Sequence, residues 1–347
     1  DLKWESTRQF NLGLDLVIGD NFNITTNYFI KNTKDLLFQP EVSGILGTTG
    51  PGGQSPIVNA GDVSNKGIEL ELAYYSDRNK ELKYAINFNT TYLRNEVLKT
   101  PDGVEFIPGA AFGVGGGVAT RFEEGFAIGY FHGFETDGIF QSQEEIDNAT
   151  VVQEGAKPGD IRYVDQNGDG VISFNDDSDR KEIGSAIPDF TFGLNLSAEY
   201  KNFDFSMNVF AAVGQEIIRN YERQQPFANQ LDYVIDRWVG TGTSNDNPRL
   251  TTEANRNGEF SDYFVENGAF MRIKNIQLGY TLPEKLSKKI KSNSIRLYVS
   301  VNNLLTVTQY RGFDPEIGSV GGALAAGVDY GFYPQARTVM GGFNFKF

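Results

Sequence analysis

The sequence predicts an all-β protein, a transmembrane antiparallel β-barrel, from three observations. Apolar residues recur at every second position over segments of about 9–11 residues, the length that crosses a bilayer as a tilted strand. The residues between them are mostly Asn, Thr, Glu, Gly and Ser, which suit a water-filled interior. The last segment, 339–347, alternates in the same way and ends on Phe347. Its apolar row would be a sticky strand edge in water, whereas in a membrane it faces lipid.

A soluble β-sandwich has the same two-residue period, so the period alone leaves both folds open. The polar character of the second face and the aromatic residues at strand ends favour the barrel, because both are typical of strands between a wet lumen and lipid.

Nine segments carry the alternation, and each is predicted to be a strand. The predicted strands lie near 7–19, 22–36, 64–76, 82–97, 188–200, 203–217, 264–282, 294–307 and 336–347. The apolar row is predicted to face lipid through Leu12, Leu14, Ile86, Leu194, Leu196, Leu297 and Phe345. The polar row is predicted to face the lumen through Asn11, Asn87, Asn195 and Asn344.

Short and long connections alternate between these segments. The short connections lie at 20–21, 77–80, 201–202 and 283–293, the last of them rich in lysine. The long ones lie at about 38–62, 98–187, 218–262 and 308–335. Outer-membrane barrels have short periplasmic turns and long extracellular loops. Nine antiparallel strands cannot close, because the first and last run the same way, so residues 1–347 are predicted to be the C-terminal portion of a larger barrel or one piece of a split barrel.

Composition sets further limits. No run approaches the roughly 18 apolar residues that a transmembrane helix needs, and a mean hydropathy of -0.35 suits a sheet that is apolar on one face only. The absence of cysteine excludes a disulfide framework and thiolate sites. The net charge of -14 argues against nucleic acid as a partner. The sequence opens at Asp1 without a leader, so an internal or processed start is expected.

Several motifs, taken in order, resemble a known family. They are Leu2-Lys3-Trp4-Glu5 and the segments 59–70 (NAGDVSNKGIEL), 158–170 (PGDIRYVDQNGDG), 188–194 (PDFTFGL), 270–280 (FMRIKNIQLGY) and 333–338 (YPQART). Together they cover essentially the whole chain and are similar to the C-terminal half of SusC/RagA-like TonB-dependent outer-membrane transporters.

The resemblance implies that the chain supplies about nine C-terminal strands of a 22-stranded barrel in the cell outer membrane, a size class whose lumen is plugged. It implies import of glycans or peptides, powered by the TonB complex through an N-terminal region that this sequence does not include. It also implies a SusD-like surface lipoprotein as a lid, with the remaining barrel, the plug segment and outer-membrane lipid as further partners. A SusC-like barrel serving as a structural or docking subunit of a larger outer-membrane complex, without import, is the alternative.

Residues 165–176 match the spacing of a calcium loop. Asp165, Asn167 and Asp169 offer oxygens at the first, third and fifth positions, Val171 offers its carbonyl at the seventh, and Asp176 stands at the twelfth. The loop departs from an EF-hand in having Asp at the twelfth position and no flanking amphipathic helices. A structural calcium ion is expected here, with no organic cofactor. A turn whose side chains bind their own backbone is the alternative.

No residue pattern points to an enzyme. His132 is the one histidine and has no nucleophile motif beside it, so a packing or surface role is expected. The glycine-rich segment 113–117 lacks the Lys-Ser/Thr of a phosphate loop and is expected to be a flexible loop. Carboxylates are numerous, but no pair has a context that singles it out as catalytic.

Aromatic residues in or beside the long loops are candidates for binding, because aromatic faces stack on sugars and anchor interfaces. They are Tyr130, Phe131, Phe134, Tyr221, Trp238, Tyr310, Phe313 and Tyr333. Packing the loops together is the alternative role. Segment 215–238 is predicted to hold a short extracellular helix, because apolar residues lie near helical spacing at Phe227, Leu231, Val234, Ile235 and Trp238.

Overall fold

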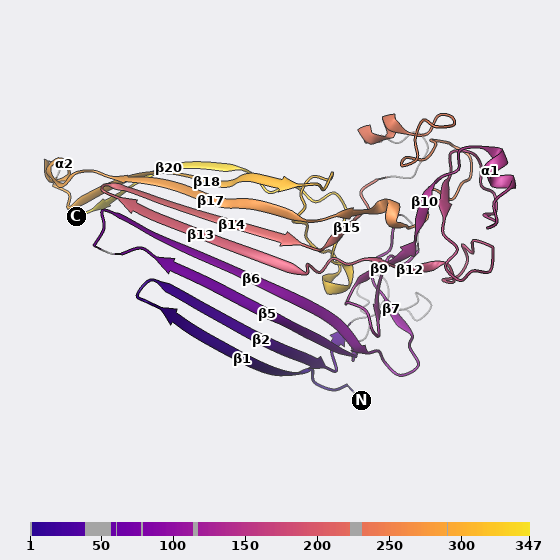
Figure 1. The fold of residues 1–347 in the computed structure, drawn as a ribbon, viewed down its shortest axis with the longest axis horizontal. Helices are drawn as coiled ribbons and strands as arrows, with labels where there is room; N and C mark the ends of the chain where they lie inside the picture. The colour runs from indigo at the N-terminus through magenta and orange to yellow at the C-terminus, as the bar shows by residue number, and fades with distance from the viewer. Residues whose placement is uncertain are drawn as a thin grey trace.

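The computed structural model describes residues 2–38, 57–59, 61–77, 79–113, 117–222, 231–289 and 291–347. Its main feature is a nine-stranded antiparallel sheet whose strands are neighbours in chain order (Figure 1). The strands are β1 (Ser6–Ile18), β2 (Phe22–Lys34), β5 (Asp62–Tyr75), β6 (Leu82–Lys99), β13 (Phe190–Tyr200), β14 (Phe203–Val213), β17 (Phe270–Thr281), β18 (Ser294–Thr308) and β20 (Thr338–Lys346). The predicted number and order of strands are confirmed.

The register places the apolar rows on one face of the sheet and the polar rows on the other. Ile86 lies opposite Leu196, whereas the next residues, Asn87 and Asn195, form the adjacent pair. Because successive side chains point to opposite faces, the leucine and asparagine rows are separated across the whole sheet. The residues predicted to face lipid share one face, and those predicted to face the lumen share the other.

Strands β1 and β20 are the two edges of this sheet, and within the described residues each pairs with one neighbour only. Phe10 on β1 and Val339 and Phe343 on β20 are exposed. A long apolar edge of this kind is a surface for pairing with further strands. The sheet is therefore an open segment of the kind that a larger barrel contains.

One end of the sheet, the turn end, has only short connections. Gly19 and Lys201 adopt positive φ angles of 62° and 53° in two of the tight turns, a conformation in which a strand reverses within a few residues. The longest of the four turn-end connections holds the short helix α2 (Glu284–Lys289), and the C-terminus lies beside it (Figure 1).

The opposite end, the loop end, gathers the four long connections (Figure 1). Their elements are β3 (Leu37–Phe38), β4 (Val58–Asn59), β7 (Phe106–Pro108), β8 (Thr120–Glu123), β9 (Tyr130–Phe134), β10 (Thr136–Ile139), α1 (Gln143–Asp147), β11 (Ile161–Tyr163), β12 (Arg180–Gly184), β15 (Glu216–Arg219), η2 (Asp232–Asp236), η3 (Asp262–Phe264), β16 (Val265–Asn267), η4 (Gly322–Ala325) and β19 (Val328–Asp329). Among the residues that the structure describes, no helix is long and apolar enough to cross a membrane.

Three of the long connections, 100–189, 214–269 and 309–337, pack into one unit that we call the loop body. Its core combines Phe112 and Phe131 of the first connection, Ile218 and Phe264 of the second, and Val328 of the third. This unit holds most of the deeply buried apolar side chains, because the outer face of the sheet has no protein layer over it. The loops thus have a hydrophobic core of their own.

The short helix predicted in 215–238 is found in part, as a 3-10 helix, and the segment begins with a strand. Residues 216–219 form β15, which pairs with β16 and, in parallel, with β19. Ile217 and Ile218 are buried there, so long-range pairing makes the start of the segment a strand, ahead of the residues at helical spacing. Later in the segment η2 forms a single 3-10 turn, and Phe227 lies outside the described residues. The predicted strands 203–217 and 264–282 are shorter for the same reason.

The assignment of faces can be tested with neighbouring residues. Leu194→Lys should destabilise the membrane-inserted protein by about 2–4 kcal/mol near the bilayer midplane, because lysine there enters lipid. Asn195→Lys is the matched control and should cost much less, because it points to the polar face. Denaturant titration of the complete protein in lipid vesicles measures both, and equal losses would contradict the assigned faces.

Candidate functional site: the inner wall and the loop body

Six asparagines lie in one cross-strand row on the polar face of the sheet. They are Asn23, Asn87, Asn195, Asn208, Asn275 and Asn302, and we call them the amide row. Asn208 Nδ2 donates to Asn195 Oδ1 at 2.5 Å, and Asn275 Nδ2 donates to Asn302 Oδ1 at 2.7 Å. Asparagine is uncommon in strands, yet it takes six of the nine positions of this row. The row offers donors and acceptors without charge.

The neighbouring row toward the turn end is also uncharged, with Ser197, Ser206, Gln277 and Ser300 in register. Charged side chains on this face of β13 to β18 lie toward the two ends. Arg296 pairs with Asp204 near the turns, and Arg272 lies near the loops. At mid-height the polar wall of β13 to β18 is therefore neutral and rich in hydrogen-bonding groups. On the other strands of this face, Asp15 of β1 and Glu71 of β5 lie in the row next to the amide row on its loop side.

Arg272 fastens the last long connection to the polar wall. Its guanidinium contacts Asp314 Oδ1 at 2.5 Å and Glu316 Oε2 at 2.8 Å, and Lys274 also binds Glu316. Burial alone would raise the pKa of Asp314. The N–H groups of Gln335 and Glu316 and the Arg272 guanidinium instead hold the pKa of Asp314 below its usual range. A buried, fully paired charge of this kind favours one loop position.

From this attachment the connection 309–337 reaches the far side of the loop end. Leu324 packs with Val63 and Val97, at the loop ends of β5 and β6, and its carbonyl accepts a hydrogen bond from Thr120 Oγ1 at 2.5 Å. In the sheet, β13, β14 and β17 separate β6 from β18. The connection therefore spans the loop end of the polar face.

A second buried ion pair joins the parts of the loop body. Arg219 is fully buried and contacts Glu266 Oε1 at 2.8 Å, and it also pairs with Glu222. Its guanidinium lies over the rings of Tyr233 and Tyr263, at 4.7 and 5.2 Å from their centroids. Carboxylates and aromatic faces together compensate the buried charge.

The aromatic loop residues divide into two groups. Tyr130, Phe131, Phe134 and Tyr310 are buried and pack the loop body, and Tyr221 and Trp238 are half-buried. By contrast, Tyr333 is 92% exposed and Phe313 is 65% exposed, both in the connection 309–337. Of the eight candidates, these two have faces open to a ligand or partner.

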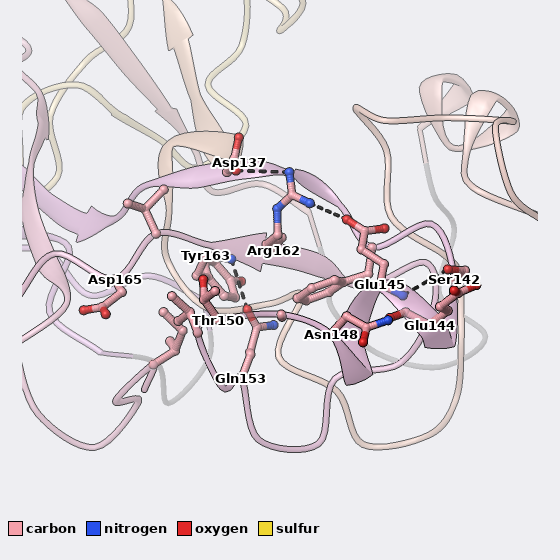
Figure 2. Close-up of a pocket in the computed structure, with 15 residues that line it drawn as sticks. Asp137, Ser142, Glu144, Glu145, Asn148, Thr150, Gln153, Arg162, Tyr163 and Asp165 are labelled. Carbon is pink, nitrogen blue, oxygen red and sulfur yellow. Dashed lines mark hydrogen bonds and ion pairs between the residues drawn. The ribbon is translucent and has the colours of Figure 1, made fainter. Parts of the chain in front are cut away.

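A cavity of about 790 Å³ lies between β10, α1, β11 and the segment 165–172 (Figure 2). Arg162 projects beside it and bridges Asp137, at 3.0 Å, and Glu145. Gln153 is likewise engaged: its Nε2 donates to the Ile161 carbonyl, and its Oε1 accepts from the Tyr163 N–H. The cavity has the size of a small-molecule site, but these polar groups already pair with one another. Sequence reasoning missed this cavity, because most of its lining comes from residues 137–153, which carry no motif, and the motif at 158–170 gives no sign of a cavity.

The predicted calcium loop forms a series of hydrogen-bonded turns. Asp165 accepts from the N–H groups of Gly168 and Gly170 at 2.7 and 2.8 Å. Asn167 accepts from the N–H of Asp169 at 2.8 Å, and Asp169 from that of Val171 at 2.9 Å. The Gly170 N–H is the main cause of the lowered pKa of Asp165. These contacts are those of the alternative interpretation, a turn that binds its own backbone.

Asp176 belongs to a separate turn, where it accepts from Ser173 Oγ at 3.0 Å and from Ser178 Oγ at 2.6 Å. In the described part of the chain, no three His, Cys, Asp or Glu side chains are grouped to hold a metal ion. Each carboxylate oxygen keeps a second lone pair, so calcium binding at Asp165, Asn167, Asp169, Val171 and Asp176 stays a prediction.

Asp179 organises this loop, and sequence reasoning did not single it out. Its carboxylate is fully buried and accepts from the N–H groups of Gln166 and Ser173 at 3.1 and 2.6 Å. Ile172 anchors the same loop by packing against Phe134 and Tyr163. No local pattern distinguishes Asp179 from the other acids nearby.

His132 lies in the packed interior of the loop body, which is the first of the two roles, packing or surface, that the sequence predicts. Its ring stands edge-on to Tyr130 at 6.0 Å between centroids. Burial, assisted by the charge of Arg121, lowers the pKa of His132 to about 4. The imidazole is therefore neutral at neutral pH. In the glycine-rich segment, the Gly113 N–H donates to Asn220 Oδ1, and 114–116 lie outside the described residues.

Comparison with known proteins gives one consistent result. The family model described as "TonB dependent receptor-like, beta-barrel" matches residues 1–304. TonB-dependent receptor P3 of Formosa agariphila is 36% identical over 360 residues, covering 100% of this chain and 34% of that protein. TonB-dependent receptor SusC of Bacteroides thetaiotaomicron is 27% identical, covering 100% of this chain and 32% of that protein.

Solved structures show the same fold. The RagAB peptide transporter superposes with a TM-score of 0.77 at 24% identity, over 99% of this chain and 35% of that one. The chain thus spans about a third of the length of the curated relatives it matches.

Calcium binding has a direct test in the paired variant Asp165→Ala with Asp169→Ala. Calcium should protect residues 160–182 of the complete protein from protease, and the double variant should lose this protection while its barrel stays folded, because two of the expected ligands are gone. Magnesium serves as the ion control. If protease sensitivity is the same with calcium and with chelator, the alternative holds and the loop is a turn that binds no calcium.

Acid should loosen the loop body through His132. Because its folded pKa of about 4 lies below the unfolded value, the unfolded state binds the extra proton, and stability falls as the pH drops from about 6.5 toward 4. Limited proteolysis across this range measures the loss. His132→Gln removes the titrating group and should show a weaker pH dependence, so identical profiles would exclude this cause.

Proposed function

The chain belongs to the TonB-dependent receptor-like β-barrel family, and from this membership we propose that it forms part of an outer-membrane importer of glycan or peptide oligomers. In this proposal the TonB complex powers import, and a SusD-like surface lipoprotein works with the receptor.

Receptors of this family lie in the cell outer membrane. The apolar face of the nine strands accordingly contacts outer-membrane lipid, and the short turns face the periplasm while the loop body is extracellular. The polar face, with the amide row, then lines the barrel interior.

The neutral part of the inner wall, formed by β13 to β18, is the observation that best supports import of polar oligomers. Sugar hydroxyls and peptide groups both donate and accept hydrogen bonds, as the asparagine side chain does. The β13 to β18 part of the wall, which has no charge at mid-height, neither repels nor traps an ion, so a polar chain there can exchange one hydrogen-bonding partner for the next. The wall suits glycans and peptides alike.

The exposed aromatics support capture at the extracellular face. Tyr333 and Phe313 lie on a connection that Arg272 holds against the inner wall. Their rings therefore belong to the part of the loop body that is attached to this wall. A lipoprotein lid is proposed by analogy with the named relatives, SusC and the RagAB peptide transporter. Catalysis forms no part of the proposal.

The proposal is tested by energy-dependent uptake in cells that carry the complete receptor. A mixture of labelled neutral oligosaccharides and peptides should enter when TonB is present and should not enter when TonB is absent. Unchanged uptake without TonB, or no uptake of any probe, would favour the alternative of a structural or docking subunit.

The double variant Phe313→Ala with Tyr333→Ala should weaken capture of the imported probe by about tenfold, because two stacking surfaces are lost. Val320→Ala removes an equally exposed apolar side chain from the same connection and is the matched control. Binding to whole cells at low probe concentration measures capture. Equal effects of the two variants would exclude a specific role for the aromatic rings.

A further inference from the structure

Helix α2 is the structured exception among the turn-end connections. It joins β17 to β18 over residues 282–293, at the end of the sheet remote from the loop body (Figure 1). The other turns at this end are shorter and hold no helix among the described residues. A structure of this size at a periplasmic turn requires a physical reason.

The connection around α2 covers the outward, lipid-facing side of β18. Ile295, Leu297 and Val299 belong to one outward row of that strand, yet Ile295 is 5% exposed whereas Leu297 and Val299 are 48% and 55% exposed. Helix α2 contacts β18, and the Leu282 N–H donates to the Ile295 carbonyl at 2.8 Å. The helix therefore lies against the outer surface of the sheet.

The level of α2 is that of the membrane boundary. A cross-strand row of the outward face holds Tyr200, Phe203, Tyr280 and Phe343, and aromatic rows of this kind mark the boundary between acyl chains and headgroups. Helix α2 begins four residues after Tyr280. Its side chains thus lie at the headgroups of the periplasmic leaflet.

The composition of α2 fits that place. Lys285, Lys288 and Lys289 of α2 and Lys291, two residues after it, carry four positive charges, and Glu284 is the single acid, paired with Lys288 at 2.5 Å. Leu286 lies among them and is 48% exposed. An exposed apolar side chain between lysines is typical of a helix that lies in the membrane interface.

We propose that Lys285, Leu286, Lys288, Lys289 and Lys291, the α2 patch, bind anionic phospholipid headgroups of the periplasmic leaflet. The lysines contact the phosphates, and Leu286 enters the acyl boundary beside Ile295. The patch fixes the depth of the β17–β18 hairpin and of the adjacent terminal strand β20. The proposal uses the membrane location of the family and does not depend on what the receptor transports.

The first test measures the position of Leu286. The chain has no cysteine, so Leu286→Cys gives one labelling site in a complete receptor without other reactive cysteines. A fluorescent label there should be quenched by lipids that carry a spin label in the acyl chain, and more strongly in vesicles of phosphatidylethanolamine with phosphatidylglycerol than in phosphatidylethanolamine alone. A label that remains in water in both vesicles would overturn the proposal and favour a soluble periplasmic partner.

The second test measures lipid selectivity. Lys285→Gln with Lys289→Gln should reduce the phosphatidylglycerol that stays bound to the purified complete receptor, measured by native mass spectrometry, by about tenfold, because each lysine at a surface adds to the attraction. Lys80→Gln with Lys201→Gln removes two lysines at the same end and is the matched control. Equal retention in the two double variants would overturn the specific role of α2.

Discussion

The structure depends on an antiparallel register that extends across nine strands. A bilayer offers no water to an unpaired N–H or carbonyl, so the backbone of each spanning strand must be paired by its neighbours. A shift of one residue in β13 would turn Leu194 to the lumen and Asn195 to lipid. The lipid-facing rows, the neutral wall of β13 to β18 and the amide row are therefore consequences of a single pairing scheme, and none of them can change independently of the others.

The loop body follows a different constraint, which is the cost of burying charge. A buried ion pair contributes little net stability, but loss of one partner leaves an uncompensated charge that costs about 3–5 kcal/mol. The ion pairs of Arg272 with Asp314 and of Arg219 with Glu266 therefore add little to the free energy of unfolding. Their main effect is to make other arrangements of the loops unfavourable. For a receptor this selection matters, because it holds the connection 309–337 across the polar face and leaves the side chains of Phe313 and Tyr333 exposed on the loop body.

The two ends of the sheet are organised by different solvents. At the loop end, water surrounds the protein, so the long connections need a hydrophobic core of their own, built around Phe131, Phe264 and Val328. At the turn end, lipid and headgroups take the place of that core. Aromatic rings and the lysines of α2 there contact the boundary between acyl chains and headgroups. This asymmetry suits the proposed import function, in which the extracellular end recognises solutes while the periplasmic end keeps a constant depth in the membrane.

The sequence by itself determined the nine strands, their order and their faces, because a two-residue period is local and each strand pairs with the next one along the chain. It did not determine the loop body, where β15 pairs with β19 more than a hundred residues later. The amide row, the Arg272 attachment and the role of Asp179 also escaped it. Each requires residues distant in the chain to meet, and only tertiary pairing and burial decide which of many similar asparagines, arginines and aspartates do so.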